Sequence, residues 1–194
     1  MDERTRERIW EQVNDLLSEE PIATPGHVRR MTEWAERVGS QVGADLDTLI
    51  PGALLHDVGV LTDRPRHFVA GRAKAAEILD EVGYPEDRRE AVLHVQEAHS
   101  RYGGPEPASV EAEVAQAADT IEYLGAIGIV RAAVRGVIDG SFSGEVDDFP
   151  AVMRKIIAGT PESLPGTAQE VAEGRSKYMS SFLERLEQEL EFEA

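Results

Sequence analysis

The sequence predicts an all-α fold, a single helical bundle with additional helices at its C-terminal end. Apolar residues recur at helical spacing, as at Ile9, Val13 and Leu17, and no stretch alternates apolar and polar residues as a half-buried strand would. Glycines and prolines divide the chain into segments of helical length. Because no linker composition interrupts it, we expect one domain over residues 1–194.

The first three helices are expected in residues 1–58. The charged segment 1–20 has helical patterning, and a second helix should begin at Thr24-Pro25, an N-cap and first-turn pair, and end near Gly43. Asp45 can cap a third helix that runs to about Val58, in which Pro51 must either kink the helix or delay its start.

The remaining helices are expected between turn signals. They cover about 67–83, 86–99 and, as one or two helices, 109–137; residues 139–144 read as a loop. A short helical stretch near 148–158 and a long helix over about 166–191 would form a C-terminal extension, about 145–192.

Composition excludes several classes of protein. There is no cysteine, so thiolate zinc sites and cysteine nucleophiles are absent, and any metal must be held by imidazole and carboxylate. The net charge of −17 repels nucleic-acid backbones and anionic lipid, so neither duplex nucleic acid nor a membrane is an expected partner. With no signal-peptide or membrane-spanning segment, the sequence predicts a cytoplasmic protein that takes a small substrate.

The five histidines are clustered in the sequence. All lie within 73 consecutive positions, and the last 95 residues contain none. The densest element is His56-Asp57, which ends an apolar segment. Adjacent helical residues differ by about 100° in direction, so both can reach one ion only if it lies over their shared edge and other helices add ligands. The alternative is a buried His-Asp hydrogen bond without an ion.

Three motifs in order carry a resemblance to a known family. They are Gly-His-Val-Arg-Arg-Met at 26–31, Ala-Leu-Leu-His-Asp-Val-Gly at 53–59, and Ala-Ala-Asp-Thr-Ile-Glu-Tyr-Leu-Gly-Ala-Ile-Gly-Ile-Val-Arg at 117–131. Over about residues 22–140 the chain resembles the HD phosphohydrolase superfamily, and in particular its small bacterial and archaeal hydrolases. The resemblance implies an all-α HD core over that range.

The resemblance also implies a metal site. Its ligands would be His27, His56, Asp57 and Asp119, and the ion would be Mn²⁺, Mg²⁺, Co²⁺, Ni²⁺, Fe²⁺ or Zn²⁺. Two imidazoles and two carboxylates suit Mn²⁺, Fe²⁺ or Co²⁺ and leave positions for water and a phosphate oxygen.

Two further histidines are expected in the pocket. His67 and His99 would bind phosphate or donate a proton to the leaving oxygen, or hold a second metal ion. The chain has Ala98 where binuclear HD proteins carry the first histidine of a pair, so the resemblance leaves the second ion open. We expect His94 to be structural.

Basic residues near these motifs are candidates for phosphate binding. We single out Lys74, two helical turns after His67 and on the same face, together with Arg72 and Arg101. The alternative for most of these residues is a solvated surface charge.

The function that these features predict is hydrolysis of a phosphate ester or anhydride of a small molecule such as a nucleotide, as a phosphatase or pyrophosphatase. The alternatives are a regulatory, ligand-binding HD module without efficient turnover and a di-iron HD oxygenase. A homodimer through the apolar residues of the last helix is one expectation, and packing of that helix on its own domain is the other. Those apolar residues are Tyr178, Phe182, Leu183, Leu186 and Leu190.

Overall fold

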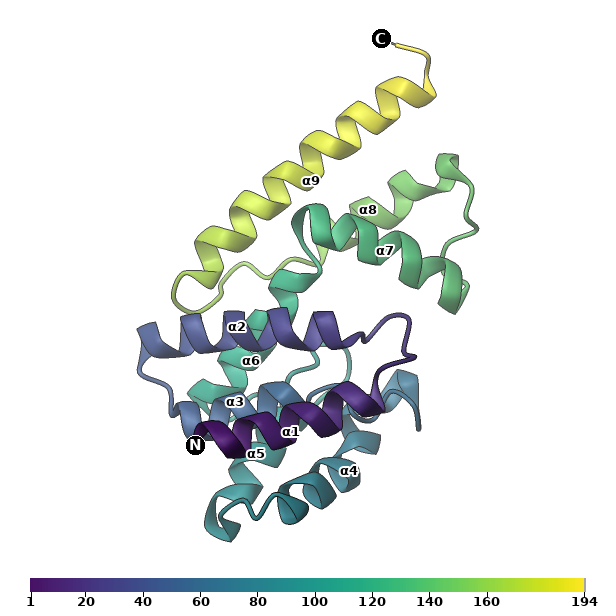
Figure 1. The fold of residues 1–194 in the computed structure, drawn as a ribbon. Helices are drawn as coiled ribbons and strands as arrows, with labels where there is room; N and C mark the ends of the chain where they lie inside the picture. Colours follow the sequence, from purple (N-terminus) through teal and green to yellow (C-terminus); the bar gives the residue numbers. More distant parts are fainter. Residues whose placement is uncertain (194) are drawn as a thin grey trace. The chain divides into compact units, whose positions relative to one another are not determined.

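A computed structural model describes residues 1–193, and it confirms the all-α fold: those residues form helices and no strand (Figure 1). The α-helices are α1 (Glu3–Leu16), α2 (Pro25–Val42), α3 (Leu46–Leu55), α4 (His67–Glu81), α5 (Glu86–Ala98), α6 (Val110–Glu122), α7 (Gly125–Asp139), α8 (Phe149–Ala158) and α9 (Ala168–Leu190). Two short 3-10 helices, η1 (Arg64–Arg66) and η2 (Val146–Asp148), precede α4 and α8.

Helix α2 begins and ends at the expected signals. The Thr24 hydroxyl accepts a hydrogen bond from the His27 amide at 3.2 Å, and Pro25 occupies the first helical position. Gly43 ends the helix with φ of +75°, a left-handed conformation that glycine adopts without steric cost. This cap fixes the start of the helix, and His27 therefore lies in its first turn.

Helix α3 tolerates a proline in its interior. It starts at Leu46, capped by Asp45, so Pro51 neither delays its start nor ends it. A residue with an N–H at position 51 would donate to the carbonyl of Asp47; proline cannot, and the Tyr84 hydroxyl donates to that carbonyl instead. The helix ends at Leu55 rather than at the expected Val58.

The chain divides into two compact units, Met1–Asp119 and the residues from Thr120 onwards. The division falls within α6 and inside the range 22–140 expected for the HD core. In the first unit α3 packs against α1, α2 and α5, and α5 also packs against α4. Every residue of α3 from Thr48 to Leu55 is buried, as expected for a helix that is apolar on all sides. The His56-Asp57 pair that follows α3 is thereby fixed to the centre of this unit.

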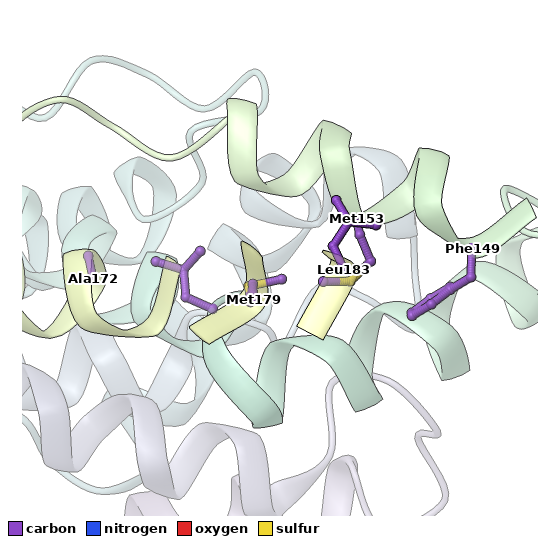
Figure 2. Packing of buried hydrophobic residues seen from close by; sticks show 6 residues of the cluster. Phe149, Met153, Ala172, Met179 and Leu183 are labelled. Carbon is purple, nitrogen blue, oxygen red and sulfur yellow. The ribbon is translucent and has the colours of Figure 1, made fainter. Parts of the chain in front are cut away.

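The second unit has its own hydrophobic core. Phe149 and Met153 of α8 lie in one buried cluster with Met179 and Leu183 of α9 (Figure 2). Phe182 and Leu186 of α9 pack against the same cluster, so these apolar residues are used within the unit. Tyr178 is 53% exposed. Packing of the last helix on its own chain thus accounts for much of its apolar face, and the homodimer stays a prediction.

Among the described residues, no helix combines the length and the apolar character that crossing a membrane requires.

Candidate metal centre

The structure brings together six residues singled out in the sequence, and all of them lie in the first unit. Each is presented by a helix or by the residues at a helix end: the first turn of α2, the C-terminal end of α3 and the residue after it, the start of α4, the C-terminal end of α5, and α6. In that order they are His27, His56, Asp57, His67, His99 and Asp119. All are buried except His67, whose side chain is 20% exposed.

Three of these histidines are oriented in the same way. In each, the Nδ1 atom lies within hydrogen-bond distance of the backbone carbonyl three residues earlier. For His56, His67 and His99 the acceptors are Ala53, Arg64 and Gln96, at 2.7, 2.9 and 2.5 Å. Because a carbonyl only accepts, Nδ1 must carry the hydrogen. In the neutral ring the Nε2 lone pair is then available to bind a cation, which is the arrangement typical of metal-ligating histidine.

The first group of side chains surrounds one oxygen of Asp57. His56 Nε2 lies 3.1 Å from His27 Nε2 and 3.1 Å from Asp57 Oδ2. His27 Nε2 lies 3.5 Å from the same oxygen and 3.4 Å from Asp119 Oδ1. Ligand atoms of His27, His56 and Asp119 all lie within 4.8 Å of one another, which is close enough for one ion to reach all three.

The second group surrounds the other oxygen of the same carboxylate. His67 Nε2 lies 3.4 Å from Asp57 Oδ1 and His99 Nε2 lies 3.9 Å from it. The two Nε2 atoms are 3.0 Å apart, and ligand atoms of all three residues lie within 4.8 Å of one another. Asp57 therefore faces two clusters, one through each oxygen.

A divalent cation fits this arrangement for reasons internal to the structure. Two pairs of Nε2 atoms approach at 3.0–3.1 Å, and a pair of unprotonated nitrogens at that distance is repulsive unless a proton or a cation lies near both. In addition, Asp119 Oδ1 is buried and accepts no hydrogen bond. Imidazole nitrogens and carboxylate oxygens are ligands that divalent transition metals accept.

Without a cation, a proton on His56 offsets the negative charges of the Asp57 and Asp119 carboxylates. Burial acts to lower the pKa of His56, but the nearby Asp57 and Asp119 carboxylates outweigh it and raise the pKa to about 9. Burial acts to raise the pKa of Asp57, and the positive charge of His56 together with hydrogen bonds from His27 and His56 holds it well below the usual range. Burial and the charge of His56 lower the pKa of His99 to about 3, which keeps that ring neutral.

Two glycines allow the His56-Asp57 turn to lie against α4. A Cβ atom at Gly59 would be 2.1 Å from the His67 carbonyl oxygen and 2.4 Å from the Gly71 nitrogen. One at Gly71 would be 2.8 Å from Gln96 Nε2 and 3.1 Å from the Gly59 nitrogen. In the sequence, Gly59 is only the last residue of the 53–59 motif, and nothing there indicates the close backbone approach that brings Asp57 to His67.

Gln96 is a supporting residue that the sequence analysis missed. It is fully buried, and its side-chain nitrogen donates to the carbonyls of Phe68, at 3.1 Å, and His56, at 3.5 Å. The backbone carbonyl of Gln96 accepts the hydrogen bond from the His99 ring. Gln96 thus connects the segments that carry His56, His67 and His99. Only its spacing of three residues before His99 could have suggested this role.

The basic residues predicted near the site are placed differently from one another. Arg72 is held by two carboxylates, those of Glu90 and Glu97, and Lys74 is paired with Glu77 at 2.9 Å. Arg101 is exposed, two residues after His99.

His94 lies outside both groups, in agreement with its expected structural role. Its Nε2 atom accepts a hydrogen bond from the Ala108 amide at 2.9 Å.

Comparison with known proteins gives a family match. The model of the HD domain family matches residues 25–124, a range that includes all six clustered residues, from His27 to Asp119. The protein YpgQ of Bacillus subtilis is 28% identical over 193 residues, with 94% of this chain and 91% of that protein covered.

Solved structures give the same fold over nearly the whole chain. A Lactobacillus plantarum protein has a TM-score of 0.76 at 21% identity, covering 98% of each chain. YpgQ, crystallised in complex with ADP, has a TM-score of 0.73 at 24% identity, covering 96% of this chain and 95% of its own. An HD-superfamily hydrolase from Bacillus thuringiensis has a TM-score of 0.70 at 25% identity, covering 97% of each chain.

Proposed function

The chain belongs to the HD domain family, and from that premise we propose that it is a metal-dependent phosphohydrolase acting on a phosphate ester or anhydride of a small molecule. The observation that carries the proposal is the convergence of four imidazole Nε2 atoms on the two oxygens of Asp57, with Asp119 beside them. A purely structural His-Asp hydrogen bond needs one such nitrogen, not four.

His27, His56, Asp57 and Asp119 would hold the ion. The donor set is mixed nitrogen and oxygen, which favours Mn²⁺, Fe²⁺ or Co²⁺ over Mg²⁺, an ion that prefers oxygen ligands alone. When bound, such an ion supplies Lewis-acid polarisation of a phosphoryl oxygen and lowers the pKa of a bound water. The chain's own part is to fix the four ligands and to exclude other solvent, since three of the four are presented by buried helix ends.

His67 and His99 have different capacities. His99 is neutral, with its hydrogen on Nδ1, so its Nε2 atom can accept a hydrogen bond or bind a cation but cannot donate a proton. His67 is the more exposed of the two, and its Nδ1 hydrogen is bonded to the Arg64 carbonyl, so a second proton on Nε2 can pass to the leaving oxygen. We therefore assign proton donation to His67 and an acceptor or second-ion ligand role to His99.

A nucleotide is the substrate class that we favour. YpgQ, which shares the fold, was crystallised with ADP, and a phosphate chain offers the oxygens that a cation and a nearby guanidinium bind. Among the predicted basic residues, Arg101 follows His99 by two positions and is our first choice for that guanidinium. Arg72 and Lys74, which pair with carboxylates in the structure, are the other two candidates.

The test is phosphate and pyrophosphate release by the metal-stripped full chain across a panel of nucleotides and phosphate esters. Mn²⁺, Mg²⁺, Co²⁺, Ni²⁺, Fe²⁺ and Zn²⁺ are added back separately. We expect turnover that requires an ion and is lost in His56→Ala, with His94→Ala as the matched control because His94 lies outside the site.

Two outcomes would contradict the proposal. If the ion is bound but no phosphate or pyrophosphate is released from any compound in the panel, the regulatory HD module is favoured. Iron-dependent oxygen consumption without phosphate release would favour the di-iron oxygenase.

A further inference from the structure

Glu20 is a buried carboxylate outside the family motifs. Its side chain is 1% exposed, and both of its oxygens are used. Oε1 accepts from the amides of Ile22 at 2.9 Å and Ala23 at 3.3 Å, in the turn that leads into α2 and His27. Oε2 lies 2.6 Å from a guanidinium nitrogen of Arg64. Glu20 therefore joins the turn before α2 to Arg64, which is 44 positions after Glu20.

Arg64 belongs to the short helix η1, which directly precedes α4. None of the three residues of η1 is buried, so apolar packing does not fix this turn to the rest of the unit. Asp63 closes the turn locally by accepting from the Arg66 amide at 3.2 Å. The Asp63 amide also donates to the Gly59 carbonyl at 3.1 Å. The ion pair between Arg64 and Glu20 is the side-chain contact that links η1 itself to the turn before α2.

The backbone carbonyl of Arg64 has its own partner in the metal centre. It lies 2.9 Å from His67 Nδ1, so its position determines the direction of the His67 ring and the nitrogen that carries the hydrogen. His67 is the most exposed of the clustered histidines, and burial restrains its ring less than it restrains the others.

We propose that the Glu20–Arg64 ion pair is a positioning device for His67: it holds the Arg64 carbonyl where His67 must donate from Nδ1 and present Nε2 to Asp57. A buried ion pair is weak evidence for stability alone, because desolvation offsets most of the Coulomb attraction. Its contribution here is geometric. The role of the ring depends on the proposed hydrolysis, whereas its tautomer can be measured without turnover.

The experiment is ¹⁵N NMR of the histidine rings in the full chain with Zn²⁺ added, a diamagnetic ion that removes the repulsion between the Nε2 atoms of His67 and His99, which lie 3.0 Å apart. It is recorded at a pH of about 8.5, well above the ordinary histidine pKa of about 6.5. In the wild type, we expect His67 and His99 to report hydrogen on Nδ1. Glu20→Gln keeps an oxygen for the Ile22 and Ala23 amides but removes the charge that holds Arg64. In that variant, His67 alone should shift toward hydrogen on Nε2, the form that free histidine favours in water.

The matched control is Glu36→Gln, which removes a partly exposed ion pair with Arg6 at 2.8 Å in the same unit, without contact to η1. It should leave both tautomers unchanged. If Glu20→Gln does not fold, the double variant Glu20→Gln/Arg64→Gln removes the pair without leaving one buried charge alone.

The proposal is overturned if His67 keeps the wild-type tautomer in Glu20→Gln. It is also overturned if His99 changes together with His67, because that would indicate general loosening of the unit. Where the wild type hydrolyses a substrate, Glu20→Gln should lower kcat by about ten- to a hundredfold with little change in KM. Absence of any hydrolysis by the wild type would refute the proposed function and leave the tautomer result standing.

Discussion

Gly59→Ala tests whether close backbone approach builds the metal centre. In the structure, a Cβ atom at this position would be 2.1 Å from the His67 carbonyl oxygen and 2.4 Å from the Gly71 nitrogen. Both neighbours are backbone atoms, so neither can turn aside as the end of a side chain would. To reach an ordinary contact of 3.4 Å, the turn and α4 must separate by about 1.3 Å.

That separation should lower both the free energy of unfolding and the rate of turnover. Overpacking of this kind costs about 1–3 kcal/mol of unfolding free energy. The same shift moves Asp57, two residues before Gly59, away from His67, whose Nε2 lies 3.4 Å from Asp57 Oδ1. Since a misplacement of about 1 Å can cost a hundredfold in rate, we expect turnover to fall by about that factor.

The assay combines urea denaturation with metal stoichiometry and turnover. Gly174→Ala is the matched control: nothing lies within 4 Å of the added Cβ, and its place inside α9 predicts a gain of about 0.5–1 kcal/mol. Wild-type stability and turnover in Gly59→Ala would refute the argument from close approach.

Four other results are expected. In the metal-stripped protein the raised pKa of His56, about 9 against an ordinary 6.5, makes the protonated ring stabilising below about pH 6.5. This contribution is lost as the pH rises toward 9, so the Tm measured in chelator should fall over that window; a flat Tm would contradict it. Added Mn²⁺ must displace the same proton, so its apparent affinity in chelator competition should rise about tenfold per pH unit up to about pH 9. Asp57→Asn should weaken Mn²⁺ binding by about a hundredfold or more, and an unchanged affinity would remove Asp57 from the ligands. Tyr84→Phe should lower the unfolding free energy by about 1–3 kcal/mol, because the Asp47 carbonyl loses the tyrosine hydroxyl and Pro51 has no amide hydrogen to replace it. Urea titration measures the change. A value near zero would mean that water replaces the hydroxyl.

Local signals predicted most of the helices. Thr24-Pro25 and Gly43 mark the bounds of α2, and Asp45 marks the start of α3, because caps depend on residues within a few positions of each other. The end of α3 was predicted three residues late. Pro51 was expected to kink the helix or delay its start, and the start is not delayed. A tyrosine 33 positions later donates to the Asp47 carbonyl, which has no amide partner at Pro51. Such a contact leaves no local trace in the sequence.

The same distinction applies to the candidate site. The order of the three motifs predicted which histidines and aspartates would lie together. What could not be predicted was the support around them: Gln96, the approach of Gly59 to Gly71, and the Glu20–Arg64 pair. Each joins segments that are distant in sequence, and a glutamine or a glutamate in an acidic chain gives no sign of its partner.

The opposed imidazole nitrogens, at 3.0 and 3.1 Å, have a thermodynamic consequence. An ion that relieves their repulsion binds the folded chain and not the unfolded one, so occupancy and folding are linked. At a free ion concentration of a hundred times Kd, one site adds about 2.7 kcal/mol to the free energy of unfolding. The stability of this protein is therefore a function of the metal activity around it, and two preparations with one sequence can melt at different temperatures.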